Sequence, residues 1–257
     1  MMDPRIELSV SDDVARITIC RVEKLNALDH EMVQALIDVC LQIERSGARV
    51  AILTGEGKAF SAGGDIDAWS SLSAVDFGRH WVREGHTAFD ALTRLAIPLI
   101  AVLNGHCLGG GLELATCADF RIAEDHIKLG LPETGLGIIP GWSGTQRAAR
   151  RYGAQVVRRM SLMGEVFTAH EAQRLGVVDH VVAKGEGLAL AMSFAEKVLK
   201  RGPQATELSK MLINASDGED VPRTLEAIAG LVAAGSDDLK EGLAAFKAKR
   251  EPKFRKL

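Results

Sequence analysis

The chain has 257 residues, of which 47% are hydrophobic and 25% are charged, and its formal net charge at pH 7 is −3. This length allows one large core, and the small net charge gives no reason to expect nucleic acid or an anionic membrane as a partner. No apolar run is long enough to span a bilayer, and no signal-peptide pattern is visible, so we expect a cytoplasmic protein with no membrane attachment.

Cysteine usage favours a reducing compartment, and histidine usage gives no sign of a metal site. The four cysteines form no CxxC pair and lie in apolar stretches, which is typical of free thiols in a reducing compartment. The seven histidines include no HExxH motif and no close pair, so we expect no metal site. His106, beside a glycine run, is expected to be packed or hydrogen-bonded rather than catalytic.

The first 100 residues alternate predicted strands and helices. Residues 6–9 and 14–20 alternate apolar and polar side chains around a turn, which predicts a β-hairpin. Asp29 is the expected N-cap of a helix with apolar residues at helical spacing. Residues 50–53 form a predicted buried strand, and residues 72–96 a predicted helix. Four of the helix residues are expected to face inward: Trp81, Phe89, Leu92 and Leu95.

The middle of the chain continues this alternation. Strands are predicted at residues 98–103, 120–123, 127–131 and 177–182, and helices at residues 144–151 and 154–160. Thr168 and Glu171 have the spacing of a capping box, which predicts a helix that ends at Gly176. Alternating strands and helices argue for an α/β core.

Only helices are predicted after about residue 187. They cover residues 188–201, 205–214, 221–234 and 236–249. We therefore expect a core domain over residues 1–186 and a C-terminal helical region over residues 187–257. A helical appendage of this kind commonly provides oligomer contacts or a lid.

Two glycine-bearing loops follow predicted strands. One contains Ala62, Gly63 and Gly64, and the other is the run 109–111. Each loop alone can be a tight turn. Together they can present two N–H groups from separate loops as an oxyanion hole, in which preorganised donors meet the charge that develops on a carbonyl oxygen.

Two glutamates near these loops favour the catalytic interpretation. Glu113 lies among Leu112, Leu114 and Ala115, and Glu133 follows Leu131 and Pro132. A buried glutamate usually has a partner, and a single one would more often pair with an arginine. Two beside amide-rich loops indicate general acid/base work, since burial and like-charge proximity separate their pKa values.

Several common signatures fail on spacing. The run 55–58 resembles a phosphate-binding loop, but Ala59 stands where Ser or Thr would hold magnesium. The run 135–137 lacks the third glycine of GxGxxG, and the run 141–144 is one residue short of a GxSxG nucleophile elbow.

Longer motifs carry a resemblance to a known family. They are Lys24-Leu25-Asn26-Ala27-Leu28, the run 58–66 (KAFSAGGDI), the run 104–115 (NGHCLGGGLELA), the run 132–147 (PETGLGIIPGWSGTQR) and the run 240–250 (KEGLAAFKAKR). In this order and spacing the chain resembles the enoyl-CoA hydratase/isomerase (crotonase) family over nearly its whole length. The motifs are more specific for the family than for one reaction within it.

The resemblance implies a fold, an assembly and a ligand. The fold is a superhelix of ββα units with a C-terminal helical region, and the assembly is a homo-oligomer, a trimer or a hexamer built as a dimer of trimers. The ligand is a coenzyme A thioester. No cofactor is implied, because coenzyme A is part of the substrate.

The resemblance also assigns residues. Gly64 and Gly110 match the positions whose N–H groups hold the thioester oxygen, and Glu113 and Glu133 match the two glutamates of hydratases. The Ala62 backbone matches a position that meets the adenine. The full set expected to bind substrate and coenzyme A is Lys24, Lys58, Ala62, Gly63, Asp65, Ile66, Gly141, Phe246 and Lys249.

Three positions depart from the family pattern. Ser143 stands where glycine is common, and Trp142 is a bulky residue at the expected acyl end. Asp67 lies where hydratases often have a lysine that reaches the nucleotide, which leaves Lys24, Lys58 or the tail lysines as alternatives for that contact.

These features predict an enoyl-CoA hydratase that adds water reversibly to trans-2-enoyl-CoA. Glu133 is expected to supply the C2 proton and Glu113 to activate or hold the water. The alternatives are an isomerase that converts 3-enoyl-CoA into 2-enoyl-CoA, which needs one glutamate, and a non-catalytic subunit that binds acyl-CoA.

Overall fold

The computed structural model describes residues 3–254 and forms two units. The first unit ends at Glu207 and the second begins at Leu208. The expected division at residue 186 falls earlier, before helix α9 (Gly187–Leu199), whose apolar side packs on the sheet of the first unit. Within the described residues, no helix is long and apolar enough to cross a membrane.

Six strands form the larger sheet, in the spatial order β1-β2-β3-β5-β7-β10. Their bounds are β1 Ile6–Ser11, β2 Val14–Ile19, β3 Val50–Gly55, β5 Leu99–Leu103, β7 Phe120–Glu124 and β10 His180–Val182. The antiparallel pair β1 and β2 confirms the predicted hairpin, and the other neighbours run parallel. Asp12 and Asp13 at the hairpin turn have φ of 51° and 62°, as a two-residue turn of this hand requires.

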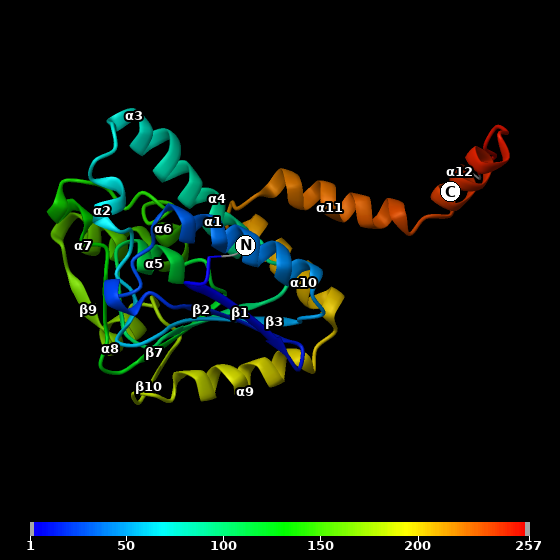
Figure 1. Ribbon diagram of the computed structural model, residues 1–257. Coiled ribbons are helices and arrows are strands. Elements are labelled where there is room, and N and C mark those ends of the chain that lie inside the picture. Colours follow the sequence, from blue (N-terminus) through cyan, green and yellow to red (C-terminus); the bar gives the residue numbers. More distant parts are fainter. Residues whose placement is uncertain (1–2, 255–257) are drawn as a thin grey trace. The chain divides into compact units, whose positions relative to one another are not determined.

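Helices cover both faces of this sheet. Helix α1 (His30–Arg45) packs its apolar side into the main core, and Asp29 caps it as predicted by accepting a hydrogen bond from the Met32 N–H. Helix α9 lies on the opposite face (Figure 1). Strands β3 and β5 are apolar along almost their whole length because both of their faces are covered.

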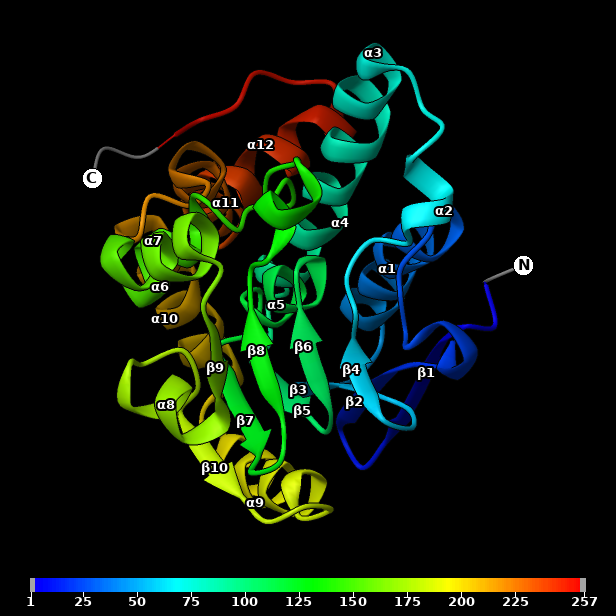
Figure 2. The ribbon, with the colours of Figure 1, turned by 90° about the vertical axis from the view of Figure 1, so that its left-hand side faces the viewer.

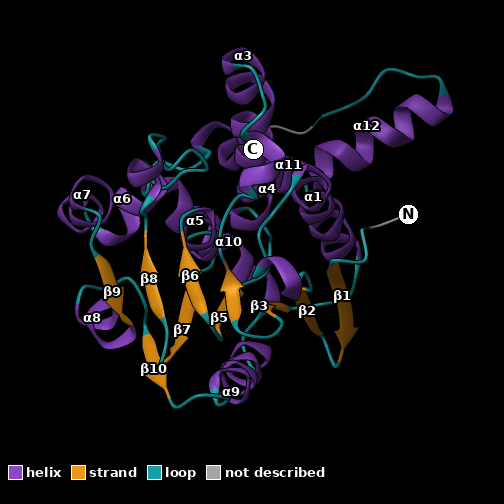
Figure 3. Ribbon diagram, turned by 60° about the vertical axis from the view of Figure 1, so that its left-hand side comes forward, coloured by secondary structure: helices purple, strands orange, loops and turns teal. Residues whose placement is uncertain are grey.

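Four short strands form a second sheet, in the order β4-β6-β8-β9 (Figure 2). Their bounds are β4 Ala59–Ser61, β6 His106–Leu108, β8 Lys128–Gly130 and β9 Val166–Thr168. Successive segments place one strand in the large sheet, the next in the small sheet and then a helix, which is the expected superhelix of ββα units (Figure 3). The sequence did not predict β4, β6 or β9, since three residues are too few to show a periodic pattern.

The predicted helix 72–96 is present but divided. It consists of α3 (Ala74–Asp76), the π-helical segment η2 (Phe77–Val82) and α4 (Arg83–Thr93), and it follows the short helix α2 (Ile66–Trp69). The four residues predicted to face inward are all buried.

The remaining helices connect these strands. Their bounds are η1 Val22–Lys24, α5 Gly110–Ala115, η3 Glu133–Leu136, α6 Arg147–Tyr152, α7 Ala154–Met163, α8 Ala169–Arg174, α10 Pro203–Ser216, α11 Val221–Ala234 and α12 Asp237–Ala248. The capping box of Thr168 and Glu171 is confirmed at α8. Helix α6 begins later than predicted, because residues 141–146 form a turn instead. All four cysteines are free, as expected.

Candidate active site

One cavity in the first unit collects most of the predicted site residues. Its wall comes from the loop after β4, from η2, from the β6–α5 junction and from residues 132–142. The lining residues are Ala62, Gly64, Ile66, Trp69, Phe77, Trp81, Val82, Leu108, Gly109, Gly110, Glu113, Pro132, Glu133, Leu136, Ile138, Ile139, Gly141 and Trp142.

The two glycine loops lie in direct backbone contact beside this cavity. A Cβ atom added to Gly63 would lie 2.8 Å from the Gly110 nitrogen, and one added to Gly110 would lie 3.2 Å from the Gly64 nitrogen. Gly63 also has φ of +97°, a conformation that side chains disfavour. The glycines are therefore required for the two loops to approach each other.

The geometry leaves the N–H groups of Gly64 and Gly110 without a protein acceptor among the described residues. The bridge between Leu28 and Gly64 uses the Gly63 carbonyl and the Asp65 N–H, so the Gly64 N–H takes no part in it. Gly110 is the first residue of α5, and the first N–H groups of a helix have no partner within the helix. Both groups are free to donate to a ligand.

The segment 21–29 holds the first of these loops in place. The Asn26 side chain accepts a hydrogen bond from the Arg21 N–H at 2.9 Å and donates to the Ala59 carbonyl at 2.7 Å. The Ser61 hydroxyl donates to the Asn26 carbonyl at 2.8 Å. Because Asn26 is fully buried, these bonds fix the strand that leads into Gly63 and Gly64.

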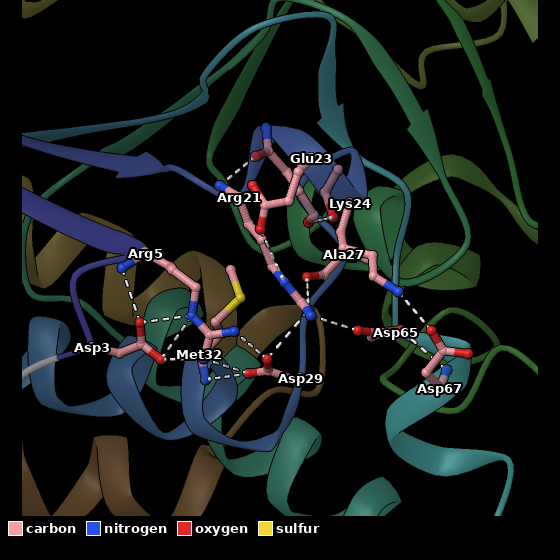
Figure 4. A network of polar contacts seen from close by, with 12 residues as sticks. Asp3, Arg5, Arg21, Glu23, Lys24, Ala27, Asp29, Met32, Asp65 and Asp67 are labelled. Atoms are coloured by element: carbon pink, nitrogen blue, oxygen red, sulfur yellow. Dashed lines mark hydrogen bonds and ion pairs between the residues drawn. The ribbon is translucent and has the colours of Figure 1, made fainter.

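Arg21 links the N-terminal ends of α1 and α2 beside the first glycine loop (Figure 4). Arg21 lies 2.7 Å from the Asp65 carboxylate and 3.2 Å from the Asp29 carboxylate, and Arg5 pairs with Asp29 from the other side (Figure 4). Asp29 caps α1 and Asp65 caps α2. Arg21 thus fixes the residue that directly follows Gly64.

Glu113 is buried, and its carboxylate is held from one side. Its Oε1 accepts hydrogen bonds from the N–H of Trp142 at 2.7 Å and of Gly144 at 2.6 Å. A Cβ at Gly144 would lie 2.8 Å from the same oxygen, so only glycine leaves room for this approach. The second oxygen is not used by these bonds.

Glu133 lies in the same cavity with no such support. Its side chain is buried, yet neither carboxylate oxygen has a hydrogen-bond partner among the described residues. Gly109 makes room for it, since a Cβ there would lie 3.1 Å from Oε1. A buried carboxyl group without donors favours its neutral form.

The two carboxyl groups titrate as a pair. Burial, and then the charge of Glu133, raises the pKa of Glu113 to about 8, although the amides of Gly144 and Trp142 oppose the rise. Burial raises the pKa of Glu133 to about 7. Because interacting groups lose their protons in steps that belong to the pair, one shared proton stays on the two glutamates near neutral pH.

Indole rings close one side of the cavity. The Trp142 ring would lie 2.9 Å from a Cβ at Gly110 and 3.3 Å from one at Gly64, so it stands beside both free amides. Its Nε1 donates to the Trp81 carbonyl at 3.0 Å, and the two ring centroids are 4.8 Å apart. The ring fills a notch at Gly85, where a Cβ would lie 2.0 Å from Nε1.

The turn that carries Trp142 contains a strained residue. Ser143 has φ of +90°, and holding a non-glycine residue there costs about 1–3 kcal/mol. Its hydroxyl lies 3.0 Å from Nδ1 of His86 on α4. The sequence singled out Ser143 only as a departure from glycine and did not indicate His86.

The other predicted binding residues fall into four groups. Ala62, Ile66 and Gly141 line the cavity. Gly63 and Asp65 support the loop behind it. The exposed lysines Lys24 and Lys58 do not line it, and Lys24 pairs with Asp67 at 2.6 Å (Figure 4). Phe246 and Lys249 belong to the second unit and so are not placed relative to this cavity.

No group of three or more His, Cys, Asp or Glu side chains among the described residues could hold a metal ion. Sequence reasoning missed Arg21 as the residue that fixes the first glycine loop. It quoted Asn26 only as part of a motif. The available signal was an Arg and an Asn a few residues before the predicted N-cap Asp29.

Comparisons with known proteins place the chain in a family. The sequence profile of the family described as Enoyl-CoA hydratase/isomerase matches residues 9–256. The chain is 37% identical to the crotonyl-CoA hydratase of Syntrophomonas wolfei, over 97% of this chain and 97% of that protein. It is also 37% identical to the short-chain-enoyl-CoA hydratase of Clostridium acetobutylicum, over 93% and 92%.

The fold is likewise similar to solved structures. An enoyl-CoA hydratase from Bacillus anthracis superposes with a TM-score of 0.80 at 36% sequence identity, and the match covers 97% of this chain and 98% of that chain. The chain therefore belongs to the enoyl-CoA hydratase/isomerase family. The fold expected from the sequence is confirmed.

Proposed function

We propose that this protein is an enoyl-CoA hydratase that adds water reversibly to a trans-2-enoyl-CoA thioester and forms a 3-hydroxyacyl-CoA. One observation carries the proposal: two buried glutamates and two unpartnered glycine amides line a single cavity. The hydratase names of the relatives support the same reaction.

The free N–H groups of Gly64 and Gly110 would bind the thioester carbonyl oxygen. As hydroxide adds at C3, negative charge moves onto this oxygen, and fixed amide donors stabilise it without reorganisation. One donor of this kind contributes about 3–4 kcal/mol to the transition state. The thioester itself makes C3 electrophilic, so this mechanism needs no metal or redox cofactor.

The two glutamates would transfer a proton to C2 and activate the water that adds at C3. The N–H groups of Trp142 and Gly144 orient Glu113 Oε1, and when the proton shared by the pair lies on Glu133, Glu113 is the base that orients and activates water. In that state Glu133, whose carboxyl oxygens have no hydrogen-bond partner among the described residues, is the acid that delivers the proton to C2. General acid/base help of this kind adds roughly 10²–10⁴-fold in rate.

The direct test is hydration of crotonyl-CoA, followed by loss of the enoyl-thioester absorbance. Glu113→Gln and Glu133→Gln should each lower kcat by at least about tenfold, because each removes one proton-transfer group. Glu196→Gln is the matched control, since Glu196 is exposed on α9. Wild-type kcat in both active-site variants would refute the two-glutamate mechanism.

A second substrate separates hydration from isomerisation. The family description covers both reactions, and moving a double bond needs only one proton-shuttling glutamate. Because this cavity contains both glutamates, we expect hydration to be the faster reaction, and a 3-enoyl-CoA should react more slowly than crotonyl-CoA. Faster turnover of the 3-enoyl thioester would make the protein an isomerase, and binding without proton exchange at C2 would make it an acyl-CoA-binding subunit.

A further inference from the structure

The turn 141–144 aims two backbone donors at one carboxylate oxygen. Trp142 and Gly144 both donate to Glu113 Oε1, and Ser143 lies between them. Ser143 has φ of +90°, which is in the region that favours glycine. Relaxation of Ser143 to a common conformation would rotate both adjoining peptide groups. The direction of the Trp142 and Gly144 N–H groups therefore depends on the conformation of Ser143.

A side chain from another element holds the strained residue. The Nδ1 atom of His86, on α4, lies 3.0 Å from the Ser143 hydroxyl, and Ser143 is only 2% exposed. The backbone of Gly141, in the same turn, also acts on the ring and raises the pKa of His86. The imidazole of α4 is thus hydrogen-bonded to the strained residue of the turn.

The surroundings of His86 suit a neutral ring. Burial lowers the pKa of His86, Arg147 acts in the same direction, and Asp90 opposes them. Arg147 and Asp90 are themselves paired at 2.5 Å. A neutral imidazole has one donor and one acceptor nitrogen, so its Nδ1 can accept a hydrogen bond from the Ser143 hydroxyl.

We propose that His86 is a positioning residue that holds Ser143 in its left-handed conformation and thereby keeps the Trp142 and Gly144 amides directed at Glu113. The inference rests on the proposed function, in which Glu113 activates water. His86 acts through the turn and does not line the cavity that would receive the substrate.

This role has a kinetic signature. Loss of the tether frees the turn and misdirects Glu113, but it leaves the Gly64 and Gly110 amides in their own loops. His86→Ala should therefore lower kcat for crotonyl-CoA by about tenfold and change KM by less than about twofold. Ser143→Ala removes the same hydrogen bond from the other side while keeping the strain, and it should have a similar effect.

Rescue by glycine distinguishes positioning from general destabilisation. Glycine adopts a φ of this sign without help, so a turn with Ser143→Gly no longer needs the tether. In that background His86→Ala should lower kcat by less than about threefold, against about tenfold in the Ser143 background. An equal loss in both backgrounds would overturn the proposal, and so would unchanged kcat in both His86→Ala and Ser143→Ala.

A readout without catalysis separates this inference from the proposed function. The amides of Gly144 and Trp142 lower the pKa of Glu113 against the effect of burial. If His86→Ala misdirects them, the Glu113 pKa should rise in carboxyl-carbon NMR titrations of the full chain, with Ser143→Ala as the second variant. An unchanged Glu113 pKa in both variants overturns the inference, whereas a wild-type chain that does not hydrate crotonyl-CoA overturns only the proposed function.

Discussion

At the scale of single residues, the site depends on two carboxyl groups with different support. Glu113 has two backbone donors and Glu133 has none, yet both are buried in one cavity. Such a pair cannot be fully ionised without a large cost, because burial disfavours charge and each charge disfavours the other. The site is consequently a source of instability that increases as protons leave.

This cost predicts how stability depends on pH. The pKa values of Glu113 and Glu133 rise from 4.5 to about 8 and about 7 on folding, so between these limits the folded chain binds more protons than the unfolded chain. The free energy of unfolding should therefore fall as pH rises through this window. Urea unfolding at about pH 5 and about pH 8.5 measures the fall.

A double variant tests whether the two glutamates cause this pH dependence. Glu113→Gln combined with Glu133→Gln removes both titrations, so its free energy of unfolding should decrease less over the same pH interval than that of the wild type. Glu196→Gln should behave like the wild type, because Glu196 is exposed. Equal decreases in the double variant and the wild type would show that the two glutamates are not shifted upward.

A second residue-scale prediction contrasts two ion pairs near the first glycine loop. Arg21 and Asp65 are both nearly buried, whereas Lys24 and Asp67 are exposed. Asp65→Ala leaves Arg21 with Asp29 and with the exposed Glu23 at 3.8 Å. Breaking a buried pair costs about 3–5 kcal/mol when one charge is left unpaired, so a loss of roughly half that is expected. The loop after Asp65→Ala is also less fixed, so kcat should fall.

Lys24→Ala is the control for this change, because an exposed pair contributes little. Thermal unfolding and crotonyl-CoA kinetics on both variants make the comparison. The sequence placed Asp65 among the substrate-binding residues, and in that case Asp65→Ala would raise KM without lowering stability. A raised KM with unchanged stability would contradict the role of Asp65 in fixing the first glycine loop.

At the scale of elements, the sequence predicted what local patterns determine. The hairpin of β1 and β2, the Asp29 cap and the Thr168 capping box all depend on neighbouring residues, and each is present. The paired glutamates were also predictable, because an acidic residue in an apolar segment is conspicuous. What the sequence could not predict was pairing between distant segments.

Three features show this limit. The strands of the second sheet are too short to have a pattern and form only because their partners lie beside them. The π-helical segment η2 follows from tertiary contacts, since its Trp81 carbonyl accepts the Trp142 indole N–H. The contact of His86 with Ser143 joins residues far apart in the chain and leaves no local signal.

The Trp142 ring, which packs on η2 and α4, predicts the length of the acyl group that the site accepts. The Trp142 ring stands beside the free amides of Gly64 and Gly110, and its hydrogen bond to the Trp81 carbonyl holds it against α4 at Gly85. Trp142→Ala should open this side and raise the ratio of kcat/KM for trans-2-decenoyl-CoA to that for crotonyl-CoA by at least about tenfold. The variant keeps the backbone N–H that Glu113 uses.

Trp142→Phe controls for loss of the indole hydrogen bond, because it keeps an aromatic wall. Its substrate ratio should stay within about threefold of the wild-type ratio. Removing a buried tryptophan also costs about 3–5 kcal/mol, so both variants need a check of folding by thermal unfolding. An unchanged ratio in a folded Trp142→Ala variant would show that the acyl chain leaves the cavity by another side.

At the scale of the whole molecule, the second unit carries apolar surface that it does not bury itself. Helices α11 and α12 expose large apolar side chains: Leu225, Leu231, Val232, Leu239, Leu243 and Phe246. Soluble monomers rarely expose contiguous apolar patches of more than a few hundred Å², and larger ones mark contact sites. Two helices of this composition are typical of an oligomer interface.

We therefore expect the full chain to associate with copies of itself, as the family resemblance predicts for a trimer or hexamer. Light scattering coupled to size-exclusion chromatography measures the mass directly. Leu231→Asp places a charge among the exposed apolar side chains of α11 and should lower the mass towards that of one chain, because burying an unpaired charge is costly. Lys247→Asp, at an exposed polar position on α12, should leave the mass unchanged. A wild-type chain that elutes as a monomer at all concentrations would contradict the expectation, and a mass unchanged by Leu231→Asp would place the interface away from that face of α11.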